Sequence, residues 1–134
     1  LGEIDEEKLN LVKKALNEIK FKRFEANLNK IGWFPNDHRI NVIWVGLKPE
    51  KNILELHGDI ELKLASLFEN DERFSVHITL GRVKHVKNKE KFLNLLKSIK
   101  VNSEKFVIDE VCLFRSILSK DGPKYDILER CHPS

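Results

Sequence analysis

An imidazole and a hydroxyl stand two residues apart at His77 and Thr79, within residues 74–84 of the sequence. On an extended strand, residues at this spacing share a face about 6–7 Å apart, so both side chains can converge on one anion. The hydroxyl donates a hydrogen bond, and the imidazole titrates near neutral pH and can transfer a proton. The pair is therefore a candidate site for proton transfer at a phosphate. The alternative is an ordinary exposed or half-buried pair on a strand.

Arg82 follows this pair as a permanent cation whose forked donors suit a phosphate group. Its parity along the strand is opposite to that of His77 and Thr79, so a regular strand would point it to the other face. Gly81 allows a bulge or a turn, and Arg82 joins the candidate site only if the strand bends there. Further cations continue towards the next expected helix, at Lys84, Lys87, Lys89 and Lys91.

These cations lie near an expected helix N-terminus, where positive charge opposes the helix dipole and an anionic ligand is favoured. Solvated surface is the alternative interpretation. The stretch around His77 also alternates strictly between apolar and polar residues, which predicts a strand. We expect this strand to bury its apolar parity, which consists of Phe74, Val76, Ile78 and Leu80.

The run from His77 to Val83, HITLGRV, resembles the second signature of the two-histidine phosphoesterases. It is most similar to the RNA 2',3'-cyclic phosphodiesterase / 2'-5' RNA ligase family. Two earlier segments, Gly32–Pro35 and Arg39–Gly46, are also similar to segments of that family. The opening Leu1–Asp5 resembles the residues just downstream of the family's first His-x-Thr-x signature, so the resemblance covers nearly the whole chain.

The resemblance implies an α+β, bilobal phosphoesterase fold, with two antiparallel sheets in a pseudo-two-fold repeat and helices packed outside. It implies metal-independent hydrolysis of 2',3'-cyclic phosphate ends of RNA or nucleotides to 2'-phosphates, without a cofactor. By the family's pattern, His77 and Thr79 are the catalytic residues, as proton acceptor and phosphate-binding hydroxyl. Arg82 matches a nearby basic residue that holds the substrate phosphate.

This reaction needs a base and an acid on opposite sides of phosphorus, so one histidine cannot serve both positions. None of the other histidines starts a matching second signature, although His132-Pro-Ser fits the spacing at the C-terminus. We therefore expect the family's N-terminal strand and helix, with the first signature, to precede Leu1. Without that segment, the 134 residues are expected to form a poor enzyme or none.

The hydrophobic pattern predicts the elements that position the candidate site. Helices are expected at residues 6–19 with Asp5 as cap, at 50–68 and after Asn88, where Phe92, Leu95, Leu96 and Ile99 form an apolar stripe. Other strands are expected at 21–34 with a bulge, and at 40–47, 106–118 and 125–131, with turns at 35–37 and 120–123. Helix, strand, turn and strand occur at 6–47 and again at 88–131, which predicts an internal repeat.

Length and composition indicate one globular domain over residues 1–134, with 34% charged residues and a net charge of +3. An anionic partner is compatible with this charge but not required by it. Cys112 and Cys131 lack the spacing of a metal or redox motif and are expected to be reduced thiols. Because no run could span a bilayer and no signal-peptide pattern begins the chain, we expect a cytoplasmic protein that does not bind a membrane. We also expect it to be a monomer without an obligate protein partner.

Two other functions remain open from the sequence. The same site run backwards would join a 2',3'-cyclic phosphate to a 5'-hydroxyl, which is 2'-5' RNA ligase activity. A chain with only one His-x-Thr half-site could instead be an inactive module that binds RNA or phosphate. The aromatic residues Trp33, Phe34 and Trp44 could stack on a base, although burial in the core is the alternative for Trp44.

Overall fold

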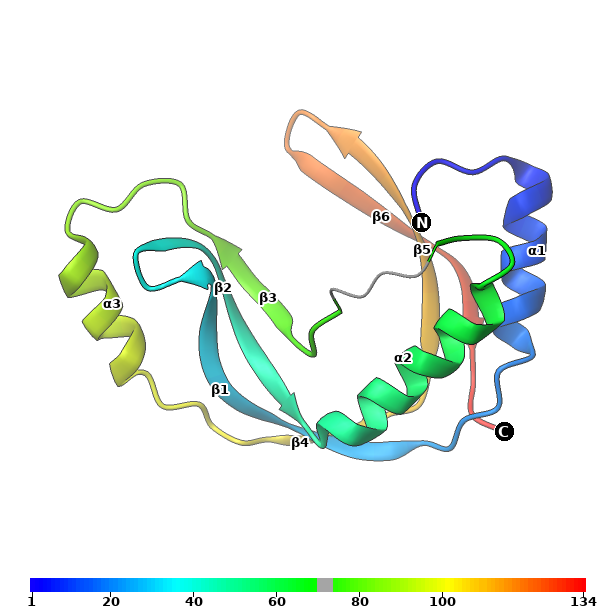
Figure 1. Cartoon of the computed structure of the whole chain (residues 1–134), viewed down its shortest axis with the longest axis horizontal. Helices are drawn as coiled ribbons and strands as arrows, with labels where there is room; N and C mark the ends of the chain where they lie inside the picture. The colour runs from blue at the N-terminus through cyan, green and yellow to red at the C-terminus, as the bar shows by residue number, and fades with distance from the viewer. Residues whose placement is uncertain (70–73) are drawn as a thin grey trace. The chain divides into compact units, whose positions relative to one another are not determined.

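The computed structural model describes residues 1–69 and 74–134. It has an α+β architecture, and contacts divide the chain into two compact units. The first unit comprises Leu1–Phe24, Glu55–Glu72 and Val107–Ser134, and the second comprises Glu25–Leu54 and Arg73–Phe106. The elements in chain order are α1 (Glu6–Asn17), β1 (Phe24–Asn36), β2 (Arg39–Lys48), α2 (Glu50–Leu64), β3 (Ile78–Arg82), α3 (Lys89–Ser98), β4 (Lys105–Ile108), β5 (Val111–Ser119) and β6 (Gly122–Cys131) (Figure 1).

The core of the first unit forms where α1 meets the β5–β6 hairpin. Asp5 caps α1 as expected, since its carboxylate accepts a hydrogen bond from the Lys8 N–H at 2.7 Å. Val12 is fully buried and packs in one cluster with Leu113 of β5 and Cys131 of β6. The helix therefore uses its apolar side to cover the hairpin, as an amphipathic helix does.

Both cysteines are free thiols in this unit. Burial raises the pKa of the Cys131 thiol above its ordinary value of 9.0. Burial also raises the pKa of Cys112, whose Sγ donates a hydrogen bond to Glu110 Oε1 at 3.2 Å. Both thiols are thus held in their protonated form at neutral pH.

The long strand expected at 106–118 is two strands in the structure, which corrects the prediction. β4 joins the four-stranded sheet, whereas β5 pairs with β6 in a separate two-stranded sheet. The break falls at Asp109 and Glu110, which lie outside both strands. Gly122 begins β6 with φ of 109°, so the connecting turn is shorter than the expected 120–123.

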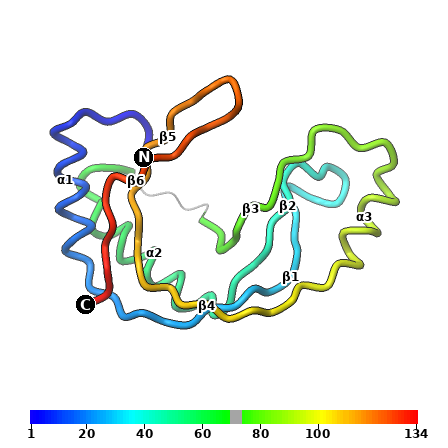
Figure 2. The backbone as a smooth tube through the Cα atoms, turned by 180° about the vertical axis from the view of Figure 1, so that it is seen from behind, coloured from blue at the N-terminus to red at the C-terminus, as the bar shows by residue number. Residues whose placement is uncertain are grey.

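The second unit is built on the sheet with strand order β3-β2-β1-β4 (Figure 2). The bulge expected in β1 is confirmed, because its register against β2 shifts between Leu28 and Ile31. The turn between β1 and β2 comes later than expected, at Asp37 and His38, after strand pairing that includes Pro35. The Asn36 side chain closes this turn by accepting hydrogen bonds from the backbone N–H groups of His38 and Arg39.

β3 differs from the strand predicted around His77. It spans only Ile78–Arg82, and residues 74–77 approach it without regular strand structure. The expected burial of the apolar parity is wrong, since Phe74, Ile78 and Leu80 are 42%, 42% and 58% exposed. The physical reason is position: β3 is an edge strand of its sheet, so among the described residues it pairs on one side only.

α2 ends at Leu64, so the helix expected at 50–68 is shorter than predicted. α3 begins at Lys89. Asn88 caps α3 as expected, its side chain accepting from the Lys91 N–H at 3.0 Å. Of the predicted apolar stripe on α3, Leu96 is buried but Leu95 and Ile99 are exposed. None of the helices in the described ranges is both long and apolar enough to cross a membrane.

Candidate active site

A bulge in β3 decides which side chains share the candidate site. Thr79 lies opposite Trp44 of β2, whereas Gly81 lies opposite Ile43, so Leu80 is an extra residue on β3. Past this bulge Arg82 lies opposite Val42. Because residues opposite one another in a sheet point to the same face, and positions 42 and 44 share a face, Arg82 and Thr79 do too. Arg82 was expected to join the site only if the strand bends at Gly81. The structure has a bulge one residue earlier, at Leu80, with the same effect on the face of Arg82.

The His77 ring is held beside two aromatic side chains of the same unit. It stands edge-on to Phe34, with ring centroids 5.2 Å apart and an interplanar angle of 85°. Its contact with the Trp44 ring is also edge-on, with centroids 6.2 Å apart. His77 remains only partly buried, and Thr79 and Arg82 are exposed. The imidazole is thus positioned by neighbours without being enclosed by them.

One ring nitrogen of His77 has a backbone partner. Its Nδ1 lies 2.8 Å from the carbonyl oxygen of Ser75. A carbonyl can only accept a hydrogen bond, so in this contact Nδ1 carries the proton. In the neutral ring, Nε2 then has the free lone pair and can accept a proton. This arrangement is the one that a general base of the histidine type requires.

The aromatic support under His77 depends on a glycine. A Cβ atom on Gly32 would lie 2.1 Å from Cζ2 of the Trp44 indole, so the ring fits only because Gly32 has no side chain. The Phe34 and Trp44 rings pack against each other with centroids 5.1 Å apart. The Trp44 Nε1 is buried and has no hydrogen-bond partner among the residues described. Packing alone therefore holds this indole in place.

A hollow of about 340 Å³ borders the site on the side of residues 74–76, which lead into His77. Trp44 and Gly46, which share a face of β2, line it together with Asn29 and Lys30 of β1. Glu50 and Leu54 of α2 complete the lining. The hollow therefore shares Trp44 with the surroundings of the His77 ring, whereas His77, Thr79 and Arg82 do not line it.

The structure places the His77 ring beside Trp44, which lies opposite Thr79, and the bulge puts Arg82 on the face of Thr79. It also adds neighbours that sequence reasoning missed. Gly32 and the Ser75 carbonyl were not anticipated as parts of the site. The signal for Gly32 was its place directly before Trp33 and Phe34, in a segment already noted for its resemblance. For the Ser75 carbonyl the sequence carries no signal, because a backbone carbonyl exists at every residue.

Comparison with known proteins supports one family. The chain matches the family described as "LigT like Phosphoesterase" over residues 1–44 and 45–125. It is 36% identical over 132 residues to the RNA 2',3'-cyclic phosphodiesterase of Methanocaldococcus jannaschii, covering 96% of this chain and 74% of that protein. The RNA 2',3'-cyclic phosphodiesterase of Archaeoglobus fulgidus is 39% identical over 129 residues, with 93% of this chain and 71% of that protein covered.

Solved structures show the same fold. E. coli LigT complexed with 3'-AMP superposes with a TM-score of 0.75 at 20% identity, covering 100% of this chain and 73% of that one. A protein of Thermus thermophilus superposes with a TM-score of 0.73 at 24% identity, covering 98% of this chain and 73% of that one. The match to the family over residues 1–125 and the identity to these relatives show that this chain belongs to the LigT-like phosphoesterase family.

Proposed function

We propose that this chain carries half of the active site of a metal-independent phosphodiesterase that opens 2',3'-cyclic phosphate ends of RNA or nucleotides to 2'-phosphates. Water attacks phosphorus and gives its proton to a base, while the bond from phosphorus to the ribose 3'-oxygen breaks. That oxygen takes a proton from an acid on the opposite side. The two relatives named RNA 2',3'-cyclic phosphodiesterase, at 36% and 39% identity, support this choice of substrate.

In this proposal His77 is the base. The observation that carries the assignment is the 2.8 Å contact between its Nδ1 and the Ser75 carbonyl, which leaves Nε2 as the proton acceptor. Phe34 and Trp44 limit rotation of the ring by packing against it edge-on. A fixed ring lowers the cost of orienting the base in the transition state.

Thr79 and Arg82 bind the phosphate in this proposal. The Thr79 hydroxyl donates to a non-bridging oxygen, and the Arg82 guanidinium neutralises the charge on the group. The register of β3 supports these two roles, since the bulge puts both side chains on one face of the sheet. Two donors on one face, with a base beside them, suit an anionic substrate.

We assign the acid to another His-x-Thr segment outside these 134 residues, the family's first signature, which the predicted internal repeat would relate to the His77 segment. Acid–base catalysis by one such group contributes about 10²- to 10⁴-fold in rate. The 134-residue chain alone should therefore hydrolyse a cyclic phosphate slowly, and supplying that segment should raise the rate by a factor in that range. Reading the coding sequence upstream of Leu1 for an in-frame His-x-Thr strand is the direct check of this assignment.

The test of the proposal is hydrolysis of a nucleoside 2',3'-cyclic phosphate in the presence of EDTA, followed by phosphorus NMR. We expect a 2'-phosphate as the product and a loss of turnover in His77→Ala. His132→Ala is the matched control, because His132 is exposed in the first unit, to which none of the proposed site residues belongs. Turnover that disappears with EDTA, or that His77→Ala leaves intact, would contradict the proposal.

The same experiment separates the alternatives. A 5'-hydroxyl oligonucleotide added to the reaction reports ligation, because a 2'-5' joined product then appears beside the 2'-phosphate. Calorimetric binding of the cyclic nucleotide without turnover, even after the segment with the first signature is supplied, would indicate an inactive binding module.

A further inference from the structure

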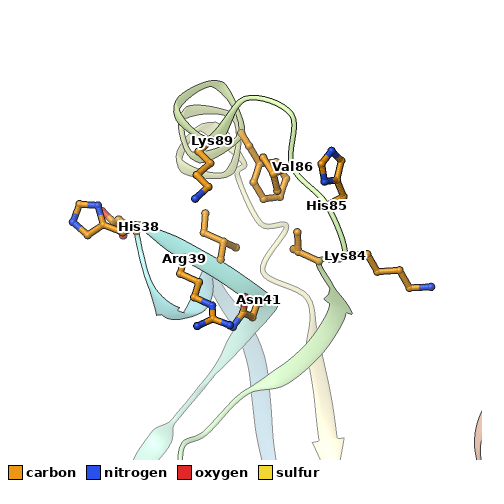
Figure 3. Close-up of a pocket in the computed structure, with 11 residues that line it drawn as sticks. His38, Arg39, Asn41, Lys84, His85, Val86 and Lys89 are labelled. Atoms are coloured by element: carbon orange, nitrogen blue, oxygen red, sulfur yellow. The ribbon is translucent and has the colours of Figure 1, made fainter.

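A second pocket lies beyond the end of the β2–β3 pairing in the second unit. The Val83 N–H donates to the Asn41 carbonyl at 2.8 Å and so continues the pairing of the two strands past Arg82. Next to this bond is a cavity of about 240 Å³. Its walls come from three segments: residues 37–41, residues 83–86 and the first turns of α3 (Figure 3).

The charge of this pocket is predominantly positive. Three permanent cations line it, together with two histidines and one carboxylate: Arg39, Lys84, Lys89, His38, His85 and Asp37. The carboxylate is already engaged, since it accepts a hydrogen bond from the Trp33 indole N–H at 2.9 Å and lies 3.9 Å from Lys97 Nζ. An anion entering the pocket therefore meets more positive than negative charge.

Lys89 and Arg39 lie at two different places on the wall of the pocket. Figure 3 shows the Lys89 side chain reaching from the start of α3 towards β2, and the Arg39 guanidinium lying beside Asn41. In the same view, Lys84 and His38 extend away from the pocket. We call this feature the Arg39–Lys89 pocket.

The position of Lys89 gives a second, independent reason to expect an anion. Lys89 is the first residue of α3, where the helix dipole places partial positive charge, so an ammonium group there is unfavourable in isolation. The Asn88 cap satisfies the Lys91 N–H without adding formal charge, and Glu90 supplies one carboxylate in the first turn. A bound phosphate would add to the Glu90 carboxylate in offsetting the positive charge of Lys89 and of the helix end.

The pocket lies in line with the proposed site along the same pair of strands. Thr79 lies opposite Trp44 and Val83 bonds to Asn41, three residues away on β2, which corresponds to about 10 Å at ~3.3 Å per residue. A stacked nucleic-acid strand advances ~3.4 Å per nucleotide, so a strand of about three to four nucleotides spans this distance. Arg82 lies between the two places and continues the row of positive charge.

We propose that the Arg39–Lys89 pocket binds a backbone phosphate of the RNA strand whose cyclic end occupies the His77 site. This inference rests on the proposed function and names the substrate more closely: an RNA end attached to a strand, in preference to a free cyclic mononucleotide. The pocket contributes only when the substrate is long enough to reach it. Affinity for the longer substrate should also depend on salt, because a phosphate contact releases counterions from the strand.

The test compares two double variants that each remove two positive charges. Arg39→Gln with Lys89→Gln alters the pocket, whereas Lys20→Gln with Lys22→Gln changes exposed lysines of the first unit. For each protein, kcat/KM is measured on a hexaribonucleotide with a 2',3'-cyclic end and on a cyclic mononucleotide. We expect the ratio of the two values to fall roughly tenfold in the pocket variant and to stay constant in the control.

A binding measurement keeps this inference separate from the proposed function. A labelled hexaribonucleotide with a 2'-phosphate end is titrated by fluorescence anisotropy at several salt concentrations. Loss of one phosphate contact lowers the slope of log K against log salt by about 0.7. If the slope is lower in the pocket variant than in the unaltered chain but the unaltered chain hydrolyses nothing, the proposed function fails and the pocket stands.

Equal slopes and equal substrate ratios in the two double variants would overturn the pocket assignment, whatever the rate of hydrolysis. Thermal melts show whether each variant is folded. If the pocket double variant does not fold, Lys89→Gln alone provides the test, since removing a cation from the start of α3 relieves repulsion with the helix dipole. That single variant should lower the same slope and the same ratio, and no change in either would contradict the assignment.

Discussion

The His77 ring stands edge-on to Phe34, with centroids 5.2 Å apart, in a contact that joins the segment before β3 to β1. This contact links the proposed base to the inner part of its sheet. Phe34 does not touch the reacting atoms in our proposal, so it is a positioning residue.

Replacing Phe34 by leucine should loosen the His77 ring. Edge-to-face aromatic pairs contribute about 0.5–1.5 kcal/mol beyond their buried area, so kcat should fall about two- to tenfold. KM should change less, because Thr79 and Arg82 still bind the phosphate. Nitrogen chemical shifts of the imidazole measure the effect directly, since loss of the Ser75 contact mixes the two tautomers.

Phe114→Leu is the control for that experiment. It removes another edge-to-face pair, that of Phe114 with Tyr125 in the β5–β6 hairpin, whose centroids are 6.2 Å apart. A similar loss of stability without a change in the imidazole shifts is expected. Identical imidazole shifts in Phe34→Leu and the unaltered chain would show that Phe34 does not position the base.

Gly32→Ala should destabilise the second unit. The new methyl group would lie 2.1 Å from the Trp44 ring, and overpacking of this kind costs about 1–3 kcal/mol in free energy of unfolding. Gly46→Ala is the matched control, because its nearest contact would be an ordinary 3.6 Å. Chemical denaturation measures both. Combining Gly32→Ala with Trp44→Val should restore part of the stability, and a double variant no more stable than Gly32→Ala would show that the clash is elsewhere.

Thr79→Val should weaken binding of the phosphate while keeping the size and branching of the side chain. A hydrogen bond to a charged group is worth about 1.5–3 kcal/mol, so affinity for a nucleoside 2'-phosphate should fall about ten- to hundredfold. Thr79→Ser keeps the hydroxyl and should retain most of that affinity. Calorimetric titration distinguishes the two, and equal affinities in both variants would remove Thr79 from the site.

Stability should fall as pH rises above about 9. Burial raises the pKa of the Cys131 thiol above 9.0, so over this range the unfolded chain loses its proton more readily than the folded one. Stability from this group is therefore complete below the unfolded value and is lost as pH rises through the folded value. Denaturation at several pH values measures the slope. Cys131→Ala should flatten it, and a slope unchanged in that variant would assign it to other groups.

The local features of the fold could be predicted from the sequence. Asp5 and Asn88 cap their helices because a short polar side chain there accepts a backbone hydrogen bond, an effect confined to one turn. The bulge in β1 was visible because the apolar parity changes between Leu28 and Ile31. Both signals depend only on neighbours in the chain.

Features that depend on distant partners could not be predicted. The exposure of Ile78 and Leu80 follows from the edge position of β3, which alternation alone does not reveal. Likewise, Phe34 and Trp44 could be noted as aromatic residues, but only the strand register shows that they meet at His77. The division at Asp109 depends on β4 and β5 joining different sheets.

The extra residue in β3 makes a local irregularity of the backbone a determinant of specificity. His77 and Arg82 are separated by an odd number of positions, and an uninterrupted strand would send the guanidinium to the opposite surface of the sheet. Deleting Leu80 would leave Thr79, Gly81 and Arg82 opposite Trp44, Ile43 and Val42 in regular alternation, so the binding face should persist. Engineers who regularise this strand should therefore remove Leu80 together with the bulge, because a regular strand that keeps Leu80 would turn the guanidinium away from the face of Thr79.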